Sequence, residues 1–397
     1  MGAPLHDLVV IDLSRALAGP HAAMMLGDMG ARVIKVETPA TGDDTRAWGP
    51  PFVGSDQDIS TYFLSCNRNK ESIELDLKSD DGRGVLTRLI RHADVLIENF
   101  RPGVLDRLGF PVERLHELNP RLVVLSISGF GHDGPESGRA GYDQIAQGEA
   151  GLMSITGPDP EHPTRVGVPI GDLLAGMYGA YGVLAALVER QHTGVGRVVR
   201  TSLLAAVVGV HAFQGTAYTV AGKVGRAQGN HHPSICPYGL FRCADGAVQV
   251  AVGSEGLWKK FCAAFEIDPA TPGMETNPVR VANRDRVIQF VEGVFAAYPS
   301  SELIPRLERA GIPVGKVRSI DEVYTWDQTR SQGLIIDVDH AALGPIRLPG
   351  PPIRFDDNDF AGGAAEHRPP PVLGQHNDSV RAWLDEVEAG DRPGATP

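Results

Sequence analysis

The chain has 397 residues, with 37 Lys and Arg against 49 Asp and Glu, so its formal net charge at pH 7 is −12. This length exceeds the size at which one hydrophobic core stops growing, and we expect two domains. A hydrophobic content of 42% is ordinary for a soluble globular protein and excludes a disordered or fibrous chain. The acidic charge balance argues against nucleic acid as a partner, because binding a phosphate backbone requires an excess of Lys and Arg.

The chain has four cysteines, Cys66, Cys236, Cys243 and Cys262. They show no metal-ligand spacing, and in a chain of this length we interpret them as reduced, cytoplasmic thiols. The N-terminal residues MGAPLHDLVVIDLS lack both a basic region and a long apolar region, so no secretory signal is predicted. The longest apolar runs, 173–187 and 203–210, fall short of the roughly 18–20 residues of a membrane span. We therefore expect a cytoplasmic protein that has no membrane segment and binds no nucleic acid.

The first third of the chain alternates short apolar strands with helices. Strands are predicted at 8–13, 32–37, 93–100 and 121–130, and helices at 21–29 and 80–92. The second helix begins after Ser79, a residue type favoured at the N-cap, and continues with two aspartates in its first turn. Apolar strands separated by helices predict a parallel sheet that is covered on both faces.

The remainder of the chain divides into segments that differ in amino-acid composition. Residues 172–222 predict two long apolar helices, and residues 223–245 form a segment rich in turn formers. A smaller unit follows, with a strand at 247–253 and helices near 255–266, 283–297 and 300–310. We thus predict an α/β protein with a large domain (1–222), a linker (223–245), a small α/β domain (246–325) and a return segment (326–397) that completes the large domain. The last segment is Pro-rich and extended, with a helix near 378–388.

Three motifs give only weak evidence for a cofactor, a metal ion or a hydrolase nucleophile. The first strand–turn–helix contains one glycine where a dinucleotide-binding loop needs three, so an ordinary α/β unit is favoured over NAD binding. His231 and His232 are adjacent, a poor arrangement for holding one metal ion, and we predict no metal site. Ser154 and Thr156 lack the strand–turn–helix motif of a hydrolase nucleophile.

Asp172 lies in the apolar segment VGVPIGDLLAG, immediately before a predicted long helix. Taken alone, this position favours an N-cap, where the carboxylate accepts a backbone hydrogen bond. The alternative is a partly desolvated nucleophile held at a helix start. The residues of this segment leave both interpretations open.

Seven motifs occur in order in the first half of the chain: SRALAGPHAAMMLGDMGARVIKVE (14–37), GDDTRAWGPPF (42–52), NRNKESIELDLK (67–78), ENFRPGVLDRLG (98–109), GFGHDGP (129–135), AGYDQIAQ (140–147) and VGVPIGDLLAG (166–176). Together with PYGLF (237–241) and RPPPVLGQH (368–376) they resemble the class III CoA-transferase family, which includes formyl-CoA and carnitine CoA-transferases. GDDTRAWGPPF and RPPPVLGQH look most like the branch that moves CoA between dicarboxylates, such as succinyl-CoA:glutarate CoA-transferase.

The resemblance implies a large domain with a Rossmann-like parallel sheet and an interlocked homodimer. It places the family's aspartate nucleophile at Asp172, which would form an aspartyl anhydride and then an aspartyl-CoA thioester. We expect Asp172 to be ionised at neutral pH and to need no general base. The resemblance implies acyl-CoA and a carboxylic acid as substrates, with succinyl-CoA as the expected donor, a dicarboxylate such as glutarate as the expected acceptor, and no permanently bound cofactor.

The resemblance also implies further site residues. Tyr142 and Asp143 match a tyrosine–acid pair beside the nucleophile, and the backbone of Ala16 and Leu17 matches the wall that faces the thioester. The residues implied to bind CoA are Ala16, Leu17, Arg46, Asn99, Phe100 and Arg107. Arg46 is included because Thr38 stands where many members have an arginine near the nucleotide.

Two other functions fit the same family. A 2-methylacyl-CoA racemase would need a proton-exchanging histidine where this chain has Tyr142, so the transferase is favoured. An inactive CoA-binding module is the third possibility, and the presence of both Asp172 and Tyr142 argues against it. Leu17 replaces the glutamine of formyl-CoA transferase, which argues against oxalate as the acceptor. Residues 229–234 replace a glycine-rich loop that gates some members, so the way this enzyme excludes water is open.

Overall fold

The computed structural model describes residues 3–355, 362–364 and 366–390, which fall into two compact units. The first unit comprises the described residues within 1–152, 165–223 and 326–397, and the second comprises 153–164 and 224–325. Residues 224–245, which fall within the segment expected to be a linker (223–245), belong to the second unit, and they contribute strand β9 (Tyr238–Cys243).

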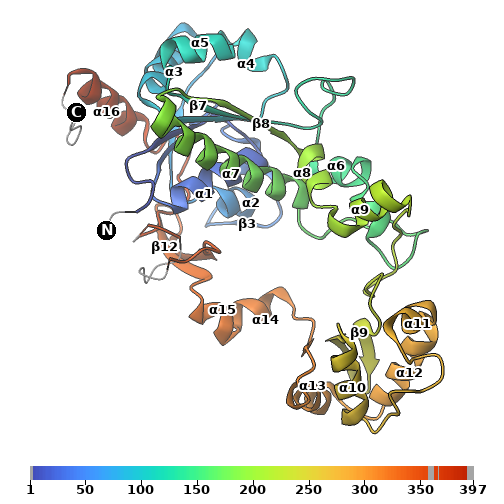
Figure 1. The fold of residues 1–397 in the computed structure, drawn as a ribbon. Coiled ribbons are helices and arrows are strands. Elements are labelled where there is room, and N and C mark those ends of the chain that lie inside the picture. The colour runs from blue at the N-terminus through green and yellow to red at the C-terminus, as the bar shows by residue number, and fades with distance from the viewer. Residues whose placement is uncertain (1–2, 356–361, 365, 391–397) are drawn as a thin grey trace. The chain divides into compact units, whose positions relative to one another are not determined.

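A six-stranded parallel sheet forms the centre of the first unit (Figure 1). Its strands, in the order in which they lie in the sheet, are β5 (Lys70–Glu74), β2 (Arg32–Glu37), β1 (Val9–Asp12), β6 (Val95–Glu98), β7 (Val123–Ser128) and β8 (Val198–Ser202). The predicted parallel sheet is confirmed. From β1 the chain builds outward to β2 and β5, and then returns to β6 on the other side. The adjacent strands β1 and β6 are thus the point where the strand order reverses, and ligands of open α/β sheets bind at the carboxyl ends of such a pair.

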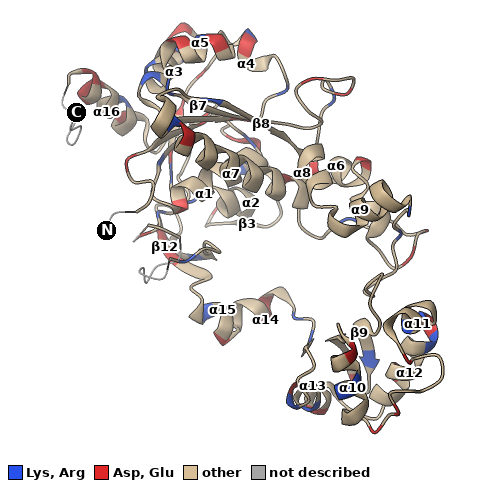
Figure 2. Ribbon diagram, in the orientation of Figure 1, with Lys and Arg blue, Asp and Glu red and all other residues tan. Residues whose placement is uncertain are grey.

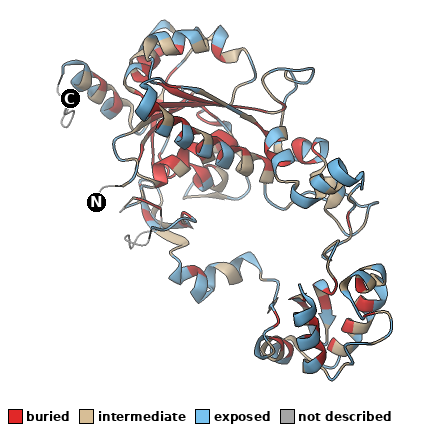
Figure 3. Ribbon diagram, in the orientation of Figure 1, coloured by how far each residue is buried: buried red, intermediate tan, exposed pale blue. Residues whose placement is uncertain are grey.

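Helices cover both faces of this sheet, and alternate residues of each strand face the two layers (Figure 3). Val10, Val95 and Val123 belong to the core beneath α1 (Ala18–Asp28) and α7 (Ile170–Thr193). Ile11 and Leu96 belong to the opposite core, beneath α3 (Asp80–His92), α5 (Val112–Leu118) and α16 (Asn377–Glu388). Ser79 caps α3, as predicted, by accepting a hydrogen bond from the backbone N–H of Gly82.

The other elements of this unit are shorter. They are the helices α2 (Thr61–Cys66), α4 (Val104–Arg107), α6 (Asp143–Glu149), α8 (Leu203–Gly209), α9 (Ala212–Ala221) and α15 (Asp327–Ser331), the 3₁₀ helices Asp44–Ala47 and Leu152–Ile155, and two hairpins, β3–β4 (Phe52–Val53, Ile59–Ser60) and β12–β13 (Ile335–His340, Gly344–Pro349). The prediction of two long helices over 172–222 was wrong in part, because the edge strand β8 separates α7 from α8 and α9.

Helix α7 is longer than its apolar run. It extends past 173–187 at both ends to 24 residues, so it is long and apolar enough to cross a membrane. Helices α8 and α9, which are bent relative to each other, meet the same criterion when they are taken together. In the described chain, however, α7 packs along α1 and against β7 and β8, which is the position of a core helix.

The second unit is a small antiparallel sheet with helices on one face. Strands β9, β10 (Gly246–Ala251) and β11 (Val314–Gly315) lie in the order β11-β10-β9. Its helices are α10 (Glu255–Ala264), α11 (Asn277–Ala282), α12 (Arg284–Phe295), α13 (Ser300–Arg309) and α14 (Ile320–Thr325). An aromatic cluster with Phe241, Phe261 and Phe295 fills the space between the sheet and the helices.

Candidate active site

Asp172 lies in the first turn of α7 and is not its N-cap. The helix begins after Pro169, which provides no side-chain cap. The acceptor comes from another helix instead: Asp143 Oδ1 accepts hydrogen bonds from the backbone N–H of Gly171 at 2.7 Å and from that of Asp172 at 3.4 Å. The local N-cap interpretation of Asp172 is therefore wrong, and its carboxylate is not used in capping the helix.

Asp143 is itself oriented by a short chain of hydrogen bonds. It is the first residue of α6, and its Oδ2 accepts a hydrogen bond from Gln147 Nε2 at 2.7 Å. Gln147 Oε1 in turn accepts from the backbone N–H of Val166 at 2.9 Å. Asp143 thus joins the start of α6 to the start of α7 and fixes the backbone that carries Asp172.

The half-buried position of Asp172 changes its acid strength. Burial, with a second contribution from the charge of Asp143, raises the pKa of Asp172 to about 7. Near pH 7 the carboxyl group is therefore only about half ionised. This corrects the expectation of a fully ionised aspartate, and a pKa near the working pH is typical of functional carboxyl groups.

One wall of the site comes from residues that the sequence motifs did not single out. Tyr62, on α2, packs with Leu17 and Leu173 around the start of α7. Burial raises the pKa of Tyr62 to about 12, with the charge of Asp172 as the next cause, so the phenol stays protonated. The ring of Trp48 meets the ring of Tyr62 edge-on, with centroids 5.1 Å apart. These side chains form an apolar wall with one hydroxyl group beside the carboxyl.

The loop between β1 and α1 carries Leu17, and its shape is fixed by side chains from distant segments. Ala16 adopts a left-handed backbone conformation (φ 64°), and its N–H donates to Asp43 Oδ1 at 3.3 Å. The side-chain amide of Asn99 makes two hydrogen bonds to the backbone of Arg15. Its Nδ2 donates to the Arg15 carbonyl at 2.7 Å, and its Oδ1 accepts from the Arg15 N–H at 2.8 Å. The first backbone N–H groups of α1, which follow Leu17, have no acceptor within the helix.

Beneath this loop lies a buried network of charges. Lys35 Nζ contacts Asp43 Oδ2 at 2.8 Å and donates to the Ser14 carbonyl at 2.9 Å. Lys70 Nζ lies 2.9 Å from Asp12 Oδ2 and donates to the Pro20 carbonyl at 2.8 Å. The two ammonium groups therefore hold both ends of the loop, and the buried carboxylates compensate their charge.

Helices α1 and α7 approach closely because α7 has a glycine at the crossing. A Cβ atom on Gly176 would lie 2.6 Å from the carbonyl oxygen of Ala18. This contact brings the start of α1, with its N–H groups, next to the turn of α7 that follows Asp172.

The remaining residues predicted to bind CoA are Phe100, Arg107 and Arg46, and they differ in their contacts. Phe100 follows β6, and Arg107 is exposed and pairs with no carboxylate in the part of the chain that the structure describes. Arg15, which we did not predict, is exposed at the carboxyl end of β1, and its Nη2 donates to Thr38 Oγ1 at 2.7 Å. Arg46 is held differently: Nε and Nη2 both bond the buried Glu37 at 2.7 Å, and the guanidinium lies over the Phe63 ring. Its contact with CoA stays a prediction.

Asp143 is hydrogen-bonded to the start of α7, whereas Tyr142 and His132 have other surroundings. The Tyr142 side chain is 66% exposed at the start of α6. His132 bonds Ser126 at the end of β7. Of the predicted pair, the structure brings Asp143 into hydrogen-bonding contact with the backbone of Asp172.

Of the cavities in the described residues, two that Asp172 does not line, one in each unit, involve residues of the sequence motifs. In the first unit, a cavity of about 440 Å³ is lined by Arg46 and by Pro371, Val372 and Leu373. The structure thereby joins the motifs GDDTRAWGPPF and RPPPVLGQH, and Arg46 Nη2 donates to the Pro371 carbonyl at 3.2 Å.

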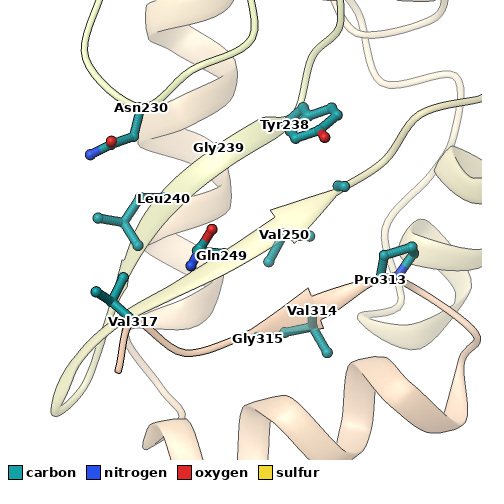
Figure 4. Close-up of a pocket in the computed structure, with 11 residues that line it drawn as sticks. Asn230, Tyr238, Gly239, Leu240, Gln249, Val250, Pro313, Val314, Gly315 and Val317 are labelled. Carbon is teal, nitrogen blue, oxygen red and sulfur yellow. The ribbon is translucent and has the colours of Figure 1, made fainter. Parts of the chain in front are cut away.

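In the second unit, a cavity of about 620 Å³ lies on the sheet face opposite the helices (Figure 4), where Leu240 and Val317 line one end. Asn230, from the loop at 229–234, lines it as well. That loop is fixed by Arg284, whose guanidinium donates to the carbonyls of His232 and Pro233. The His232 ring stacks on Tyr238. Among the described residues no cluster of three or more His, Cys, Asp or Glu side chains is arranged to hold a metal ion.

Comparison with known proteins identifies the family. The model of CoA-transferase family III matches residues 5–377. The chain is 38% identical over 379 residues to the human succinyl-CoA:glutarate CoA-transferase, covering 95% of this chain and 85% of that protein. It is also 38% identical over 402 residues to the succinate–glutarate CoA-transferase of Agrobacterium fabrum, covering 98% of each chain.

Among solved structures, a CAIB/BAIF family protein from Brucella suis superimposes with a TM-score of 0.85 at 37% identity, covering 97% of this chain and all of that one. The family match, the relatives and the fold agree with the site described above. The chain belongs to CoA-transferase family III and is a CoA-transferase.

Proposed function

We propose that this enzyme transfers CoA from succinyl-CoA to a dicarboxylate of the size of glutarate, through covalent intermediates on Asp172. The observation that carries the proposal is the carboxyl group of Asp172, half-buried at the start of α7 with a pKa raised to about 7 and kept out of the helix cap by Asp143. The names of the human and Agrobacterium relatives support the choice of acids.

The chemistry follows from a carboxylate beside a thioester. Asp172 attacks the succinyl carbonyl and CoA leaves as the thiolate, which gives an aspartyl succinyl anhydride. The thiolate attacks the aspartyl carbonyl, releasing succinate and leaving an aspartyl-CoA thioester. The acceptor carboxylate attacks this thioester, and the freed thiolate then attacks the acceptor's carbonyl in the new anhydride, which gives glutaryl-CoA and restores Asp172. Each intermediate stays activated, so the energy of the thioester is kept.

The surrounding residues have two tasks in this scheme. The N–H groups at the start of α1, after Leu17, are donors for the oxyanion that forms at each attack. The apolar wall of Leu17, Tyr62 and Leu173 limits access of water, which would hydrolyse an anhydride. At the far end of the ligand, we assign the phosphates of CoA to the exposed cations Arg15 and Arg107.

The nucleophile is tested by substitution at Asp172. We expect Asp172→Asn to abolish exchange of CoA between succinyl-CoA and labelled succinate while CoA still binds, and hydroxylamine to trap acylated Asp172 in the wild type. Asp327→Asn is the matched control, because Asp327 is an exposed aspartate in the first turn of another helix of the same unit. Turnover of Asp172→Asn at the wild-type rate would remove the assignment.

The acceptor is tested with a panel of acids. Wild-type enzyme with succinyl-CoA and glutarate, itaconate, mesaconate, malate, oxalate or carnitine is analysed by mass spectrometry for new CoA esters. We expect the largest yield with glutarate. Solvent deuterium entering the α-carbon of 2-methylacyl-CoA, without CoA transfer, identifies a racemase instead, and CoA binding without either reaction identifies an inactive module.

We also infer a homodimer. One face of α7 exposes Met177, Tyr181, Leu184 and Val188, which follow helical spacing, and Tyr181 is 73% exposed. Helices α8 and α9 continue this apolar surface, where Figure 2 shows few charged residues. Exposed apolar area of this extent is typical of a subunit interface. Sedimentation at micromolar concentration is expected to give twice the chain mass of 42.4 kDa, and Tyr181→Asp to give monomers.

A further inference from the structure

Three polar side chains meet at the carboxyl ends of β6 and β7, away from Asp172. Glu98 and Ser126 are direct neighbours in the register of the two strands, and both are buried. Ser126 Oγ bonds Glu98 Oε1 on one side and His132 Nε2, at 2.7 Å, on the other. His132 comes from the loop GFGHDGP that follows β7. We call Glu98, Ser126 and His132 the relay.

Burial raises the pKa of Glu98, and the hydrogen bonds from Ser126 and from the Phe100 N–H oppose that rise. With Glu98 ionised, the hydrogen count gives the relay one direction. Ser126 has one hydroxyl hydrogen, and with Glu98 ionised it donates that hydrogen to the carboxylate. His132 must then donate from Nε2 to Ser126 Oγ, so its Nδ1 is the acceptor that faces Ser128 Oγ at 3.5 Å. Burial lowers the pKa of His132, with Arg200 as the second cause, which favours this neutral form.

Through Glu98, the relay is hydrogen-bonded to the turn that follows β6. Glu98 Oε2 accepts a hydrogen bond from the backbone N–H of Phe100 at 2.8 Å. Between these residues lies Asn99, whose amide brackets the backbone of Arg15 in the loop after β1. Hydrogen bonds, joined through the backbone of residues 98–100, thus connect the β7 loop and the β6 turn to the β1 loop. This connection crosses the point where the strand order reverses, which is where open α/β sheets bind their ligands.

We propose that Ser126 and His132 are positioning residues for CoA: they hold Glu98 in the orientation that fixes the Asn99–Phe100 turn and, through it, the Arg15 loop. This inference rests on the proposed function, because it takes these two loops to be the face that meets CoA. None of the hydrogen bonds of the relay in the described residues involves Asp172. Its loss is therefore expected to weaken binding of CoA and to leave the chemical steps intact.

The test separates KM from kcat. His132→Ala removes the hydrogen bond to the buried Ser126, and Ser126→Ala removes the bonds to both Glu98 and His132. For each variant we expect a rise in KM for succinyl-CoA of about tenfold, with kcat at saturation changed less than about twofold. His132→Gln, which places a donor near the position of Nε2, is expected to restore KM to within about threefold of wild type. The double variant is expected to match either single one, because both act through Glu98.

Ser137→Ala is the matched control. Ser137 lies in the loop that carries His132, is half-buried, and bonds only the nearby Gly134 carbonyl. KM is expected to stay at the wild-type value in this variant. If His132→Ala fails to fold, Ser126→Cys, which keeps the volume and weakens both hydrogen bonds, takes its place in the same comparison.

Calorimetric titration of CoA into the enzyme separates failure of this inference from failure of the proposed function. Binding of CoA to wild type, with weaker binding to the relay variants, supports the inference. Equal CoA affinity in wild type and variants, with only a lower melting temperature, overturns it and leaves a purely structural network. Absence of CoA binding in the wild type overturns the proposed function itself.

Discussion

Asp143 acts on Asp172 in two ways at once. Its Oδ1 accepts the backbone N–H of Asp172 at 3.4 Å and that of Gly171 at 2.7 Å, and its charge adds to burial in raising the pKa of the Asp172 carboxyl. The hydrogen bonds supply the missing cap of α7, and the charge opposes ionisation of the residue that the cap supports. The capping residue is therefore also a determinant of the acid strength of the nucleophile.

The first prediction concerns pH. Only the carboxylate form of Asp172 is nucleophilic, so the single-turnover rate of enzyme acylation is expected to rise with pH through a midpoint near 7. Asp143→Asn removes the like charge and keeps an oxygen acceptor for Gly171, and it is expected to move the midpoint to lower pH. Quenched-flow measurement of acyl-enzyme between pH 4 and 9 checks this. A wild-type midpoint near the ordinary aspartate value would contradict it.

The second prediction concerns stability. A carboxyl group whose pKa is higher in the folded state than in the unfolded state costs free energy on ionisation, fully above pH 7 and not at all below the unfolded pKa of 3.8. Asp172→Asn is therefore expected to stabilise the fold by about 2–4 kcal/mol at pH 8. Thermal unfolding at pH 8 and at pH 4 tests the sign, because the gain must vanish at the lower pH. An equal gain at both pH values would rule out ionisation as its cause.

The third prediction concerns the approach of α1 to α7. Gly176→Ala places a Cβ atom 2.6 Å from the backbone carbonyl of Ala18, so the helices must separate, at a cost of about 1–3 kcal/mol. Because α1 carries the donors beside Asp172, kcat is also expected to fall. Gly84→Ala in α3 is the control, since a Cβ there meets nothing within 4 Å, and it is expected to stabilise by about 0.5–1 kcal/mol. Chemical denaturation and steady-state kinetics of both variants give the comparison.

The fourth prediction concerns Arg46. Its guanidinium is the bidentate partner of Glu37, which is 3% exposed, so Arg46→Ala leaves a buried charge and is expected to destabilise by about 3–5 kcal/mol. Arg347→Ala breaks an exposed pair with Asp337 and is expected to cost less than about 1 kcal/mol. Urea unfolding measures both. Loss of CoA affinity in Arg46→Ala without loss of stability would instead favour the direct contact with CoA.

The strands and helices that repeat a local pattern could be predicted, and those that depend on the fold could not. The strand at 32–37 is found at those residues, and Ser79 caps α3 by a rule that spans only three residues. The five-residue edge strand β8 was missed because it is only partly buried and directly follows a 24-residue apolar helix. Its pairing with β7 depends on residues about 70 positions earlier.

The site shows the same division. Asp172 could be singled out from its apolar setting, but the residue that caps its helix lies 29 positions away and has no local signature. Part of the buried network gave a visible sign, since Lys35 interrupts the apolar residues 33–36 of β2. Its pairing became evident only from the register, in which Asp12 lies opposite Lys35. Tyr62 had no sequence signal at all.

The last helix of the chain has a consequence for synthesis of the protein. Val380 and Leu384, on α16, are fully buried in the core that also contains Ile11, Ile73 and Leu86 from the beginning of the chain. While a ribosome is still adding residues, that core remains open, however much of the sheet has emerged. Residues 224–325, in contrast, are nearly a complete unit on their own. Residues 224–325 can therefore fold before the first unit is complete, and the unfinished apolar layer of that unit must be kept from aggregating until α16 has been synthesised.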